Sequence, residues 1–210
     1  MELRDIPQVK SIDRQAFPTV WPPPPLQRDI TNRSASLLVA VIPNGNGILD
    51  SETPKTLPRM QSKLEGFIRR LLPSWIPDGR SESLQSPEPV LGYVSIWTMG
   101  SDAHITAIAV DKTHQREGVG ELLLIGTVIS SLDRDLDCVT LEVRESNKAA
   151  QHLYLKYGFE HVGVRKNYYR DNHENALIMT TKPIASPDYQ RLFHQLTSTH
   201  KKRWGYDWNL

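Results

Sequence analysis

The fold of this chain is decided by the stretch His104-Ile-Thr-Ala-Ile-Ala-Val-Asp-Lys-Thr-His-Gln-Arg-Glu-Gly-Val-Gly120. Residues 105–110 are an unbroken run of small and β-branched side chains, which predicts a strand covered on both faces. Polar residues 111–114 turn the chain, and residues 115–132 are predicted to form an apolar helix. Because the first N–H groups of a helix lack partners and its dipole adds about half a positive charge there, this arrangement predicts an anion site.

Two glycines at the predicted helix start, Gly118 and Gly120, leave room for a phosphate to approach the backbone. A P-loop does not fit, because it needs Gly-Lys-Ser/Thr at its end and Gly120 is followed by Glu121 and Leu122. A dinucleotide fingerprint needs three glycines in a spacing that this stretch lacks. The residues therefore indicate a phosphate cradle of another kind.

Composition excludes several classes of protein. The chain has 210 residues and a formal net charge of +1, so no global basic field draws it to nucleic acid or anionic lipid. The N-terminus lacks a hydrophobic signal region, and the apolar run 37–42 is too short to span a bilayer. The seven histidines lack metal-ligand spacing. We expect a cytoplasmic protein with no membrane span, no direct nucleic-acid partner and no metal.

The chain divides by composition. Residues 43–89 hold seven of the fifteen prolines, many serines and an Asn-Gly tract, and are predicted to be an insertion. Within it, residues 60–72 have helical spacing, which fits either a packing helix or a helix that binds a partner or a membrane surface. We expect one domain over residues 1–185, with this insertion, and a C-terminal extension over 186–210 that contains a helix of unassigned role.

The remaining elements follow from hydrophobic periodicity. Strands are expected at 37–42, 90–99, 102–110 and 138–144, with a closing hairpin of 159–169 and 175–181. Helices are expected within 3–17, at 26–34 and from 147 to 157, where Gly158 is placed to end the last one.

A second informative stretch is Leu141-Glu-Val-Arg-Glu-Ser-Asn147, followed by Leu153-Tyr-Leu-Lys-Tyr-Gly-Phe159 and Arg165-Lys-Asn-Tyr-Tyr169. Glu142 places a carboxylate in an apolar strand, where it must be paired or face a cleft. The residues alone leave open whether it is bridged to an Arg or Lys or acts as a general base. Tyr154 either fills helix–sheet packing or reaches the cleft edge, since Leu153 and Tyr157 mark the expected packing face.

These motifs resemble those of a known family. The segment from Gln115 to Gly120 is similar to the Gln/Arg-x-x-Gly-x-Gly/Ala signature of the GCN5-related N-acetyltransferases (GNAT). The second stretch resembles the RimI group, whose members acetylate the N-terminal amine of a ribosomal protein. The resemblance covers residues 90–182 closely and the first 42 loosely, and it does not cover 43–89 or the C-terminal tail.

The resemblance implies an α+β fold, the GNAT acyl-CoA N-acyltransferase fold, with a mixed, mostly antiparallel sheet flanked by helices. It implies acetyl-CoA as co-substrate, Glu142 as general base and Tyr154 as general acid. Tyr168 and Tyr169 would line the groove for a peptide substrate, although strand aromatics also occur as ordinary cross-strand packing. The residues implied to bind the cofactor are Ile108, Ala109, Val110, Gln115, Arg116, Glu117, Gly118, Val119, Gly120, Glu121 and Asn147.

The acceptor expected from the resemblance is the N-terminal α-amine of a protein, with a ribosomal protein as one candidate. An α-amine has a pKa of about 7.7–8, so deprotonating it near neutral pH is easier than deprotonating lysine, at about 10.4. The proline-rich insertion leaves open a GNAT enzyme that acts on a lysine or a small amine. A non-catalytic acetyl-CoA sensor or scaffold is the remaining alternative, and it would not need both Glu142 and Tyr154.

Overall fold

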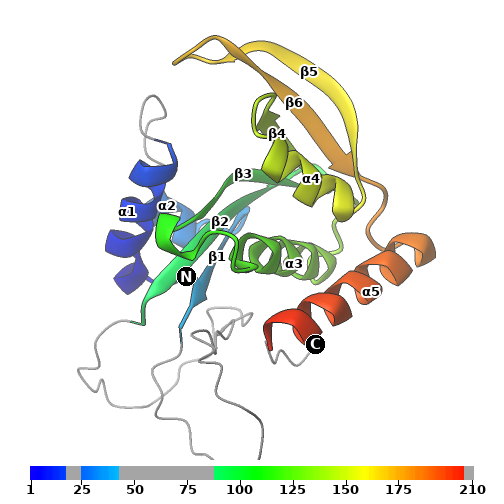
Figure 1. The fold of residues 1–210 in the computed structure, drawn as a ribbon, viewed down its shortest axis with the longest axis horizontal. Helices are drawn as coiled ribbons and strands as arrows, with labels where there is room; N and C mark the ends of the chain where they lie inside the picture. Colours follow the sequence, from blue (N-terminus) through cyan, green and yellow to red (C-terminus); the bar gives the residue numbers. More distant parts are fainter. Residues whose placement is uncertain (18–24, 43–87, 206–210) are drawn as a thin grey trace, which may run out of the picture.

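The computed structural model describes residues 1–17, 25–42 and 88–205 (Figure 1). Nearly all of the expected insertion at 43–89, including the helix expected at 60–72, lies outside these residues. The described elements otherwise follow the order expected from the sequence, including the helix of the C-terminal extension.

A six-stranded sheet, with strand order β1-β2-β3-β4-β6-β5, forms the centre of the molecule. All neighbouring strands are antiparallel except the pair β3 and β4. A mixed, mostly antiparallel sheet is therefore confirmed. The strands are β1 (Ala35–Val41), β2 (Val90–Met99), β3 (Asp102–Val110), β4 (Val139–Arg144), β5 (Phe159–Tyr169) and β6 (Glu174–Thr181).

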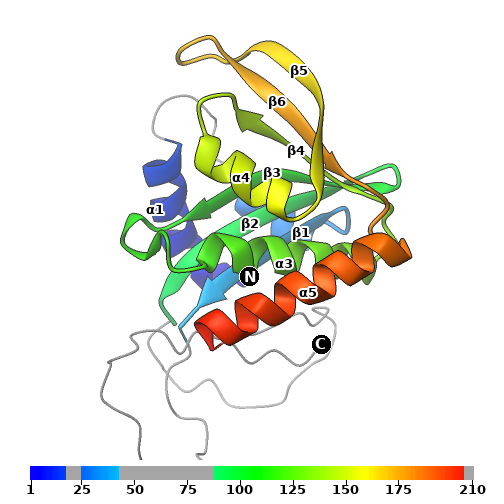
Figure 2. The ribbon, with the colours of Figure 1, turned by 45° about the vertical axis from the view of Figure 1, so that its right-hand side comes forward.

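Helices cover both faces of the sheet (Figure 2). On one face, Ile6, Val9 and Ile12 of α1 pack with the apolar residues of β1 and β2. On the other face, α3, α4 and α5 pack in a larger core with strand residues such as Leu141. The helical elements are η1 (Leu3–Asp5), α1 (Ile6–Ala16), α2 (Leu26–Thr31), η2 (Lys112–His114), α3 (Val119–Leu132), α4 (Lys148–Lys156) and α5 (Pro187–Trp204).

The parallel strands β3 and β4 separate along their length. Their ladder has three pairs and ends at Ile105 opposite Leu141. At this point the register between β2 and β3 shifts, because Ser95 pairs with Ala107 while Ile96 pairs with Ile105. A bulge of this kind bends a strand. Thr106 is the extra residue, and β3 therefore turns away from β4 and leaves its outer half unpaired on that side.

The helix expected from residue 115 starts later than predicted. Arg116 and Gly118 have φ angles of 68° and 80°, in the left-handed region, and Gly118 is the N-cap of α3. A helix cannot continue through such residues, so residues 115–118 form a turn and regular structure begins at Val119. Among the described helices, none is long and apolar enough to cross a membrane.

Candidate active site

The turn between β3 and α3 has the geometry of an anion cradle. The first internal bond of α3 runs from the N–H of Leu122 to the carbonyl of Gly118, at 2.9 Å. The N–H groups of Val119, Gly120 and Glu121 precede that bond and belong to the unpaired first turn of a helix. A Cβ added to Gly120 would make only ordinary contacts with Val110 and Leu153. Gly118 has a positive φ of 80°, which favours glycine at that position. These three N–H groups are therefore the donors available to an anion.

The Glu121 side chain has a structural task. Its Oε1 accepts a hydrogen bond from the Tyr157 hydroxyl at 2.7 Å and lies 2.5 Å from Nζ of Lys156. Both partners lie at the end of α4, so the carboxylate ties α4 to the first turn of α3. Only the backbone of Glu121 is consistent with the cofactor-binding role that the sequence implied.

The unpaired half of β3 lies directly before this turn. Ile108, Ala109 and Val110 pair with β2 on one side, and the ladder to β4 has already ended on the other. The Val110 carbonyl also accepts a long hydrogen bond of 3.5 Å from the Gln115 side chain. The Gln115 side chain thus links the turn before α3 to the end of this unpaired strand edge.

Glu142 lies on β4 on the far side of the opening between the strands. Its carboxylate is buried, with 8% of the side chain exposed. Oε2 lies 3.1 Å from Nε2 of His104 on β3, and Oε1 accepts a hydrogen bond of 2.9 Å from Nε of Arg165 on β5. The bridged carboxylate that the sequence left open is therefore present, with a histidine as well as an arginine.

The partners of Glu142 decide its charge. Burial alone would raise the pKa of Glu142, but the hydrogen bond and charge of His104 and the charge of Arg165 outweigh it, and the pKa lies below its usual value. Glu142 is therefore ionised at neutral pH. Its two oxygens are held in fixed directions by donors from two other strands, a geometry suited to orienting a water or an amine.

Tyr154 is placed differently from the sequence expectation. Its side chain is buried, and its ring lies 5.5 Å from the ring of Phe159. Gln151, Tyr154 and Tyr157 form the inward face of α4, and Leu153 is only half-buried. The expectation that Tyr154 stands beside the packing face was wrong, because the face is rotated by one residue toward Tyr154.

The Tyr154 hydroxyl is protonated at neutral pH, since burial raises its pKa. Among the described residues, none forms a hydrogen bond with this hydroxyl. Tyr169 lies within electrostatic range of both Tyr154 and Glu142. Tyr154 thus keeps its proton within the packed face of α4, and its role as general acid stays a prediction.

The tyrosine pair at the end of β5 contacts the same cluster. Tyr168 and Tyr169 meet edge to face, with ring centroids 5.2 Å apart. The guanidinium of Arg165 lies 5.9 Å from the centre of the Tyr168 ring, and that of Arg144 lies 3.9 Å from the centre of Tyr169. Burial raises the pKa of Tyr169 to about 12, against the opposing charge of Arg144. The charge of Glu142 acts on both tyrosines, so the pair lies near this carboxylate, and its substrate-groove role stays a prediction.

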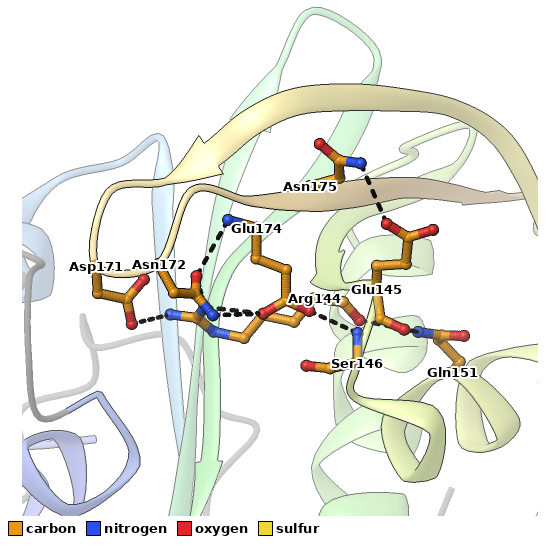
Figure 3. Close-up of polar contacts among 8 residues, drawn as sticks. All are labelled: Arg144, Glu145, Ser146, Gln151, Asp171, Asn172, Glu174 and Asn175. Carbon is orange, nitrogen blue, oxygen red and sulfur yellow. Dashed lines mark hydrogen bonds and ion pairs between the residues drawn. The ribbon is translucent and has the colours of Figure 1, made fainter.

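A polar network holds this hairpin to β4 (Figure 3). Arg144 bonds Asp171 at 2.8 Å and Glu174 at 3.1 Å, and Glu174 accepts the Ser146 N–H at 2.6 Å. The hydrogen bonds to Glu174 lower the pKa of its carboxyl to about 2. The β5–β6 turn is therefore anchored to the junction between β4 and α4.

Asn147 caps α4 in this junction. Its Oδ1 accepts a hydrogen bond of 3.1 Å from the N–H of Ala150. Gly158, with φ 75°, follows the other end of the helix. The implied contact of Asn147 with the cofactor stays a prediction.

Sequence reasoning missed three partners of the expected site residues. His104 begins the diagnostic stretch, but only the strand register places it against Glu142. Arg144 and Arg165 belong to the quoted motifs, yet their contacts depend on how the β5–β6 hairpin folds back over β4. The sequence signal for these ion pairs was weak, because several carboxylates lie near each arginine in the sequence and any of them could be its partner.

A family profile and a solved structure both match this chain. Residues 60–159 match the profile of the acetyltransferase (GNAT) family. The crystal structure of the ribosomal-protein-S18-alanine N-acetyltransferase from Escherichia coli superposes with a TM-score of 0.58 and 21% identity, over 90% of this chain and 94% of that chain. The superposition shows that this chain has the GNAT fold, and the expected fold is confirmed.

Sequence relatives narrow the resemblance. A Bacillus subtilis protein is 46% identical over 88 residues, which are 42% of this chain and 58% of that protein. The [ribosomal protein bS18]-alanine N-acetyltransferases of Haemophilus influenzae and Escherichia coli are 38% identical over 93 residues and 41% identical over 80 residues. These matches cover 43% and 37% of this chain, and 63% and 54% of the two enzymes. The chain therefore spans less than two thirds of the length of the ribosomal-protein alanine N-acetyltransferases that it resembles.

Proposed function

We propose that this protein transfers the acetyl group of acetyl-CoA to the N-terminal α-amine of a protein, a ribosomal protein being the first candidate. The observation that carries the proposal is the position of Glu142. This ionised carboxylate lies where β3 and β4 begin to separate, beside the strand that leads into the phosphate cradle, and its charge acts on both tyrosines of the pair. The names of the relatives supply the candidate acceptor, and their alanine specificity suggests peptides that begin with alanine.

The residues present fit coenzyme A. Its pyrophosphate matches the three N–H groups at the start of α3, where the helix dipole also favours negative charge. Its pantetheine arm carries amide groups, which match the unpaired edge of β3 at residues 108–110. The co-substrate supplies an acetyl group activated as a thioester, and the protein supplies donors at both ends of that molecule.

Glu142 is proposed to accept the proton of the attacking α-amine, directly or through a water. The amine has a pKa of about 7.7–8, so a large fraction is already neutral near pH 8 and a weak base suffices. The amine nitrogen forms a bond to the thioester carbon as the carbon–sulfur bond breaks. Within the described residues, no cysteine or serine paired with a base was found at the opening, which favours direct attack over an acyl-enzyme.

Tyr154 is proposed to return a proton to the departing sulfur. Burial raises the pKa of Tyr154, so the phenol keeps its proton in the resting protein and gives it up only as negative charge develops on the departing sulfur. The hydroxyl has no competing hydrogen-bond partner among the described residues. The net reaction moves the acetyl group to nitrogen, the sulfur gains a proton, and the amine proton leaves through Glu142.

The test is transfer of labelled acetyl from acetyl-CoA to a peptide that begins with alanine. We expect Glu142→Gln to lower kcat about 100-fold, with the Kd for acetyl-CoA unchanged by calorimetry. Glu145→Gln is the matched control, because this neighbouring carboxylate bonds Asn175 at 3.2 Å and lies outside the Glu142 cluster. An absence of transfer by the wild-type protein, or equal rates for wild type and Glu142→Gln, would overturn the proposal.

A further inference from the structure

The last turn of α5 contacts the phosphate cradle. Nε2 of His200 lies 3.1 Å from the carbonyl oxygen of Gly118, the N-cap of α3. The same carbonyl accepts the first internal bond of α3, from Leu122. The C-terminal extension is therefore hydrogen-bonded to Gly118, the residue at which the turn ends and α3 begins.

Trp204 lies against the other side of this residue. A Cβ added to Gly118 would approach Nε1 of Trp204 to 2.5 Å and Cε2 to 2.6 Å, which is closer than side chains tolerate. The indole thus lies on the bare Cα of Gly118. Two observations, a hydrogen bond and a close contact, join α5 to the cradle.

Helix α5 is a fixed part of the molecule. Tyr189 and Phe193 are buried in the core beneath it, and Thr197 and His200 are buried farther along. The helix runs along the side of α3 (Figure 2). Burial at four positions spread along the helix fixes its direction, so its last turn is held beside the start of α3.

That last turn places a cation beside the cradle. The guanidinium carbon of Arg203 lies 5.0 Å from the centre of the Trp204 ring, and Arg203 is exposed. The charges of Arg203, Lys156 and Glu121 all act on the pKa of His200. These three groups therefore lie near the contact between His200 and Gly118. Lys156 is paired with Glu121, whereas Arg203 has no carboxylate partner among the described residues.

We propose that the last turn of α5 forms one wall of the coenzyme-phosphate site and that Arg203 binds a phosphate of the coenzyme. The inference rests on the proposed function, because it assigns part of the same cofactor site. Coenzyme A carries a pyrophosphate and a 3′-phosphate. Three backbone N–H groups satisfy only part of that charge, and a guanidinium is well suited to a phosphate oxygen pair.

Calorimetry on the full chain tests this, with coenzyme A and dephospho-coenzyme A as probes. We expect Arg203→Gln to weaken binding of coenzyme A about three- to fivefold at low salt, as for an exposed charge pair, and Arg203→Lys to restore part of it. Near 1 M salt the difference should largely disappear. Arg191→Gln is the matched control, because it removes the same charge from the same helix roughly 18 Å away.

Each outcome is decisive. Weaker binding of coenzyme A alone assigns Arg203 to the 3′-phosphate, and equal weakening of both probes assigns it to the pyrophosphate. Unchanged affinities for Arg203→Gln, or an equal loss in Arg191→Gln, would overturn the inference while leaving the proposed function intact. Failure of the wild-type protein to bind coenzyme A would instead remove the proposed function itself.

Discussion

Nε2 of His104 lies 3.1 Å from Oε2 of Glu142, and this contact spans the end of the β3–β4 ladder, since His104 precedes the last pair by one residue and Glu142 follows it by one. The pair therefore stands at the point where the two strands begin to separate. It ties the orientation of the proposed base to the strand that continues into the phosphate cradle. Arg165 holds the second carboxylate oxygen from the hairpin side.

Replacing His104 with alanine should raise the pKa of Glu142. The pKa is now below its usual value because His104 and Arg165 outweigh burial, and burial remains after the substitution. A base with a depressed pKa is active above that pKa and loses activity as the pH falls through it. The acid limb of kcat should therefore move to higher pH in His104→Ala, and kcat should fall about tenfold. An acid limb that stays in place would contradict the pairing of His104 with Glu142. His161→Ala is the control, because it removes an exposed histidine of β5.

Removing the hydroxyl of Tyr154 should separate its two roles. Tyr154→Phe keeps the ring that packs against Phe159 and deletes only the proton donor. We expect kcat to fall about 100-fold while the Tm stays within about 2 °C, because no hydrogen bond to the hydroxyl is lost among the described residues. Steady-state kinetics and thermal unfolding measure both. A normal kcat would assign Tyr154 to packing alone.

The two glycines of the cradle should respond differently to alanine. Gly118 has φ 80° and lies under Trp204, so Gly118→Ala meets both backbone strain of about 1–2 kcal/mol and a steric conflict. Gly120 has ordinary space around its Cα. Calorimetry should show a loss of coenzyme A affinity in Gly118→Ala and near wild-type binding in Gly120→Ala. The larger Gly120→Trp should block the cradle, and retained binding there would contradict the assignment.

Glu174 should make stability depend on pH in the acid range. Hydrogen bonds lower its pKa from the ordinary value of about 4.5 to about 2. Its contribution is therefore complete above about pH 4.5 and is lost as the pH falls toward 2. Glu174→Gln should lower the Tm by about 2–4 °C at pH 7, and the difference should shrink between pH 4.5 and 2. A constant difference would show that the charge of Glu174 is not responsible.

The sequence predicted the elements well because their signals are local. The alternation in β4 and the run of small and β-branched residues in β3 each depend on neighbouring residues alone. The start of α3 was placed too early, because the left-handed conformation of Arg116 is set by the loop as a whole. The inward face of α4 was misjudged by one residue, since its packing on Phe159 decides the rotation.

The missing parts of the site depend on contacts between distant segments. His104 reaches Glu142 only through the parallel register of β3 and β4, and Arg144 reaches Glu174 only when the hairpin folds back. The contact of Trp204 with Gly118 joins residues 86 positions apart, as their numbers show. Periodicity carries no information about such pairs.

Tandem mass spectrometry of one peptide tests the central claim most directly. The peptide begins with alanine, has a free α-amine and carries an internal lysine, and it is incubated with acetyl-CoA and the full chain. The account predicts acetyl on the α-nitrogen, with the lysine unmodified and the reaction strongly slowed in Glu142→Gln. Acetyl on the lysine, or a peptide left unmodified, would contradict it.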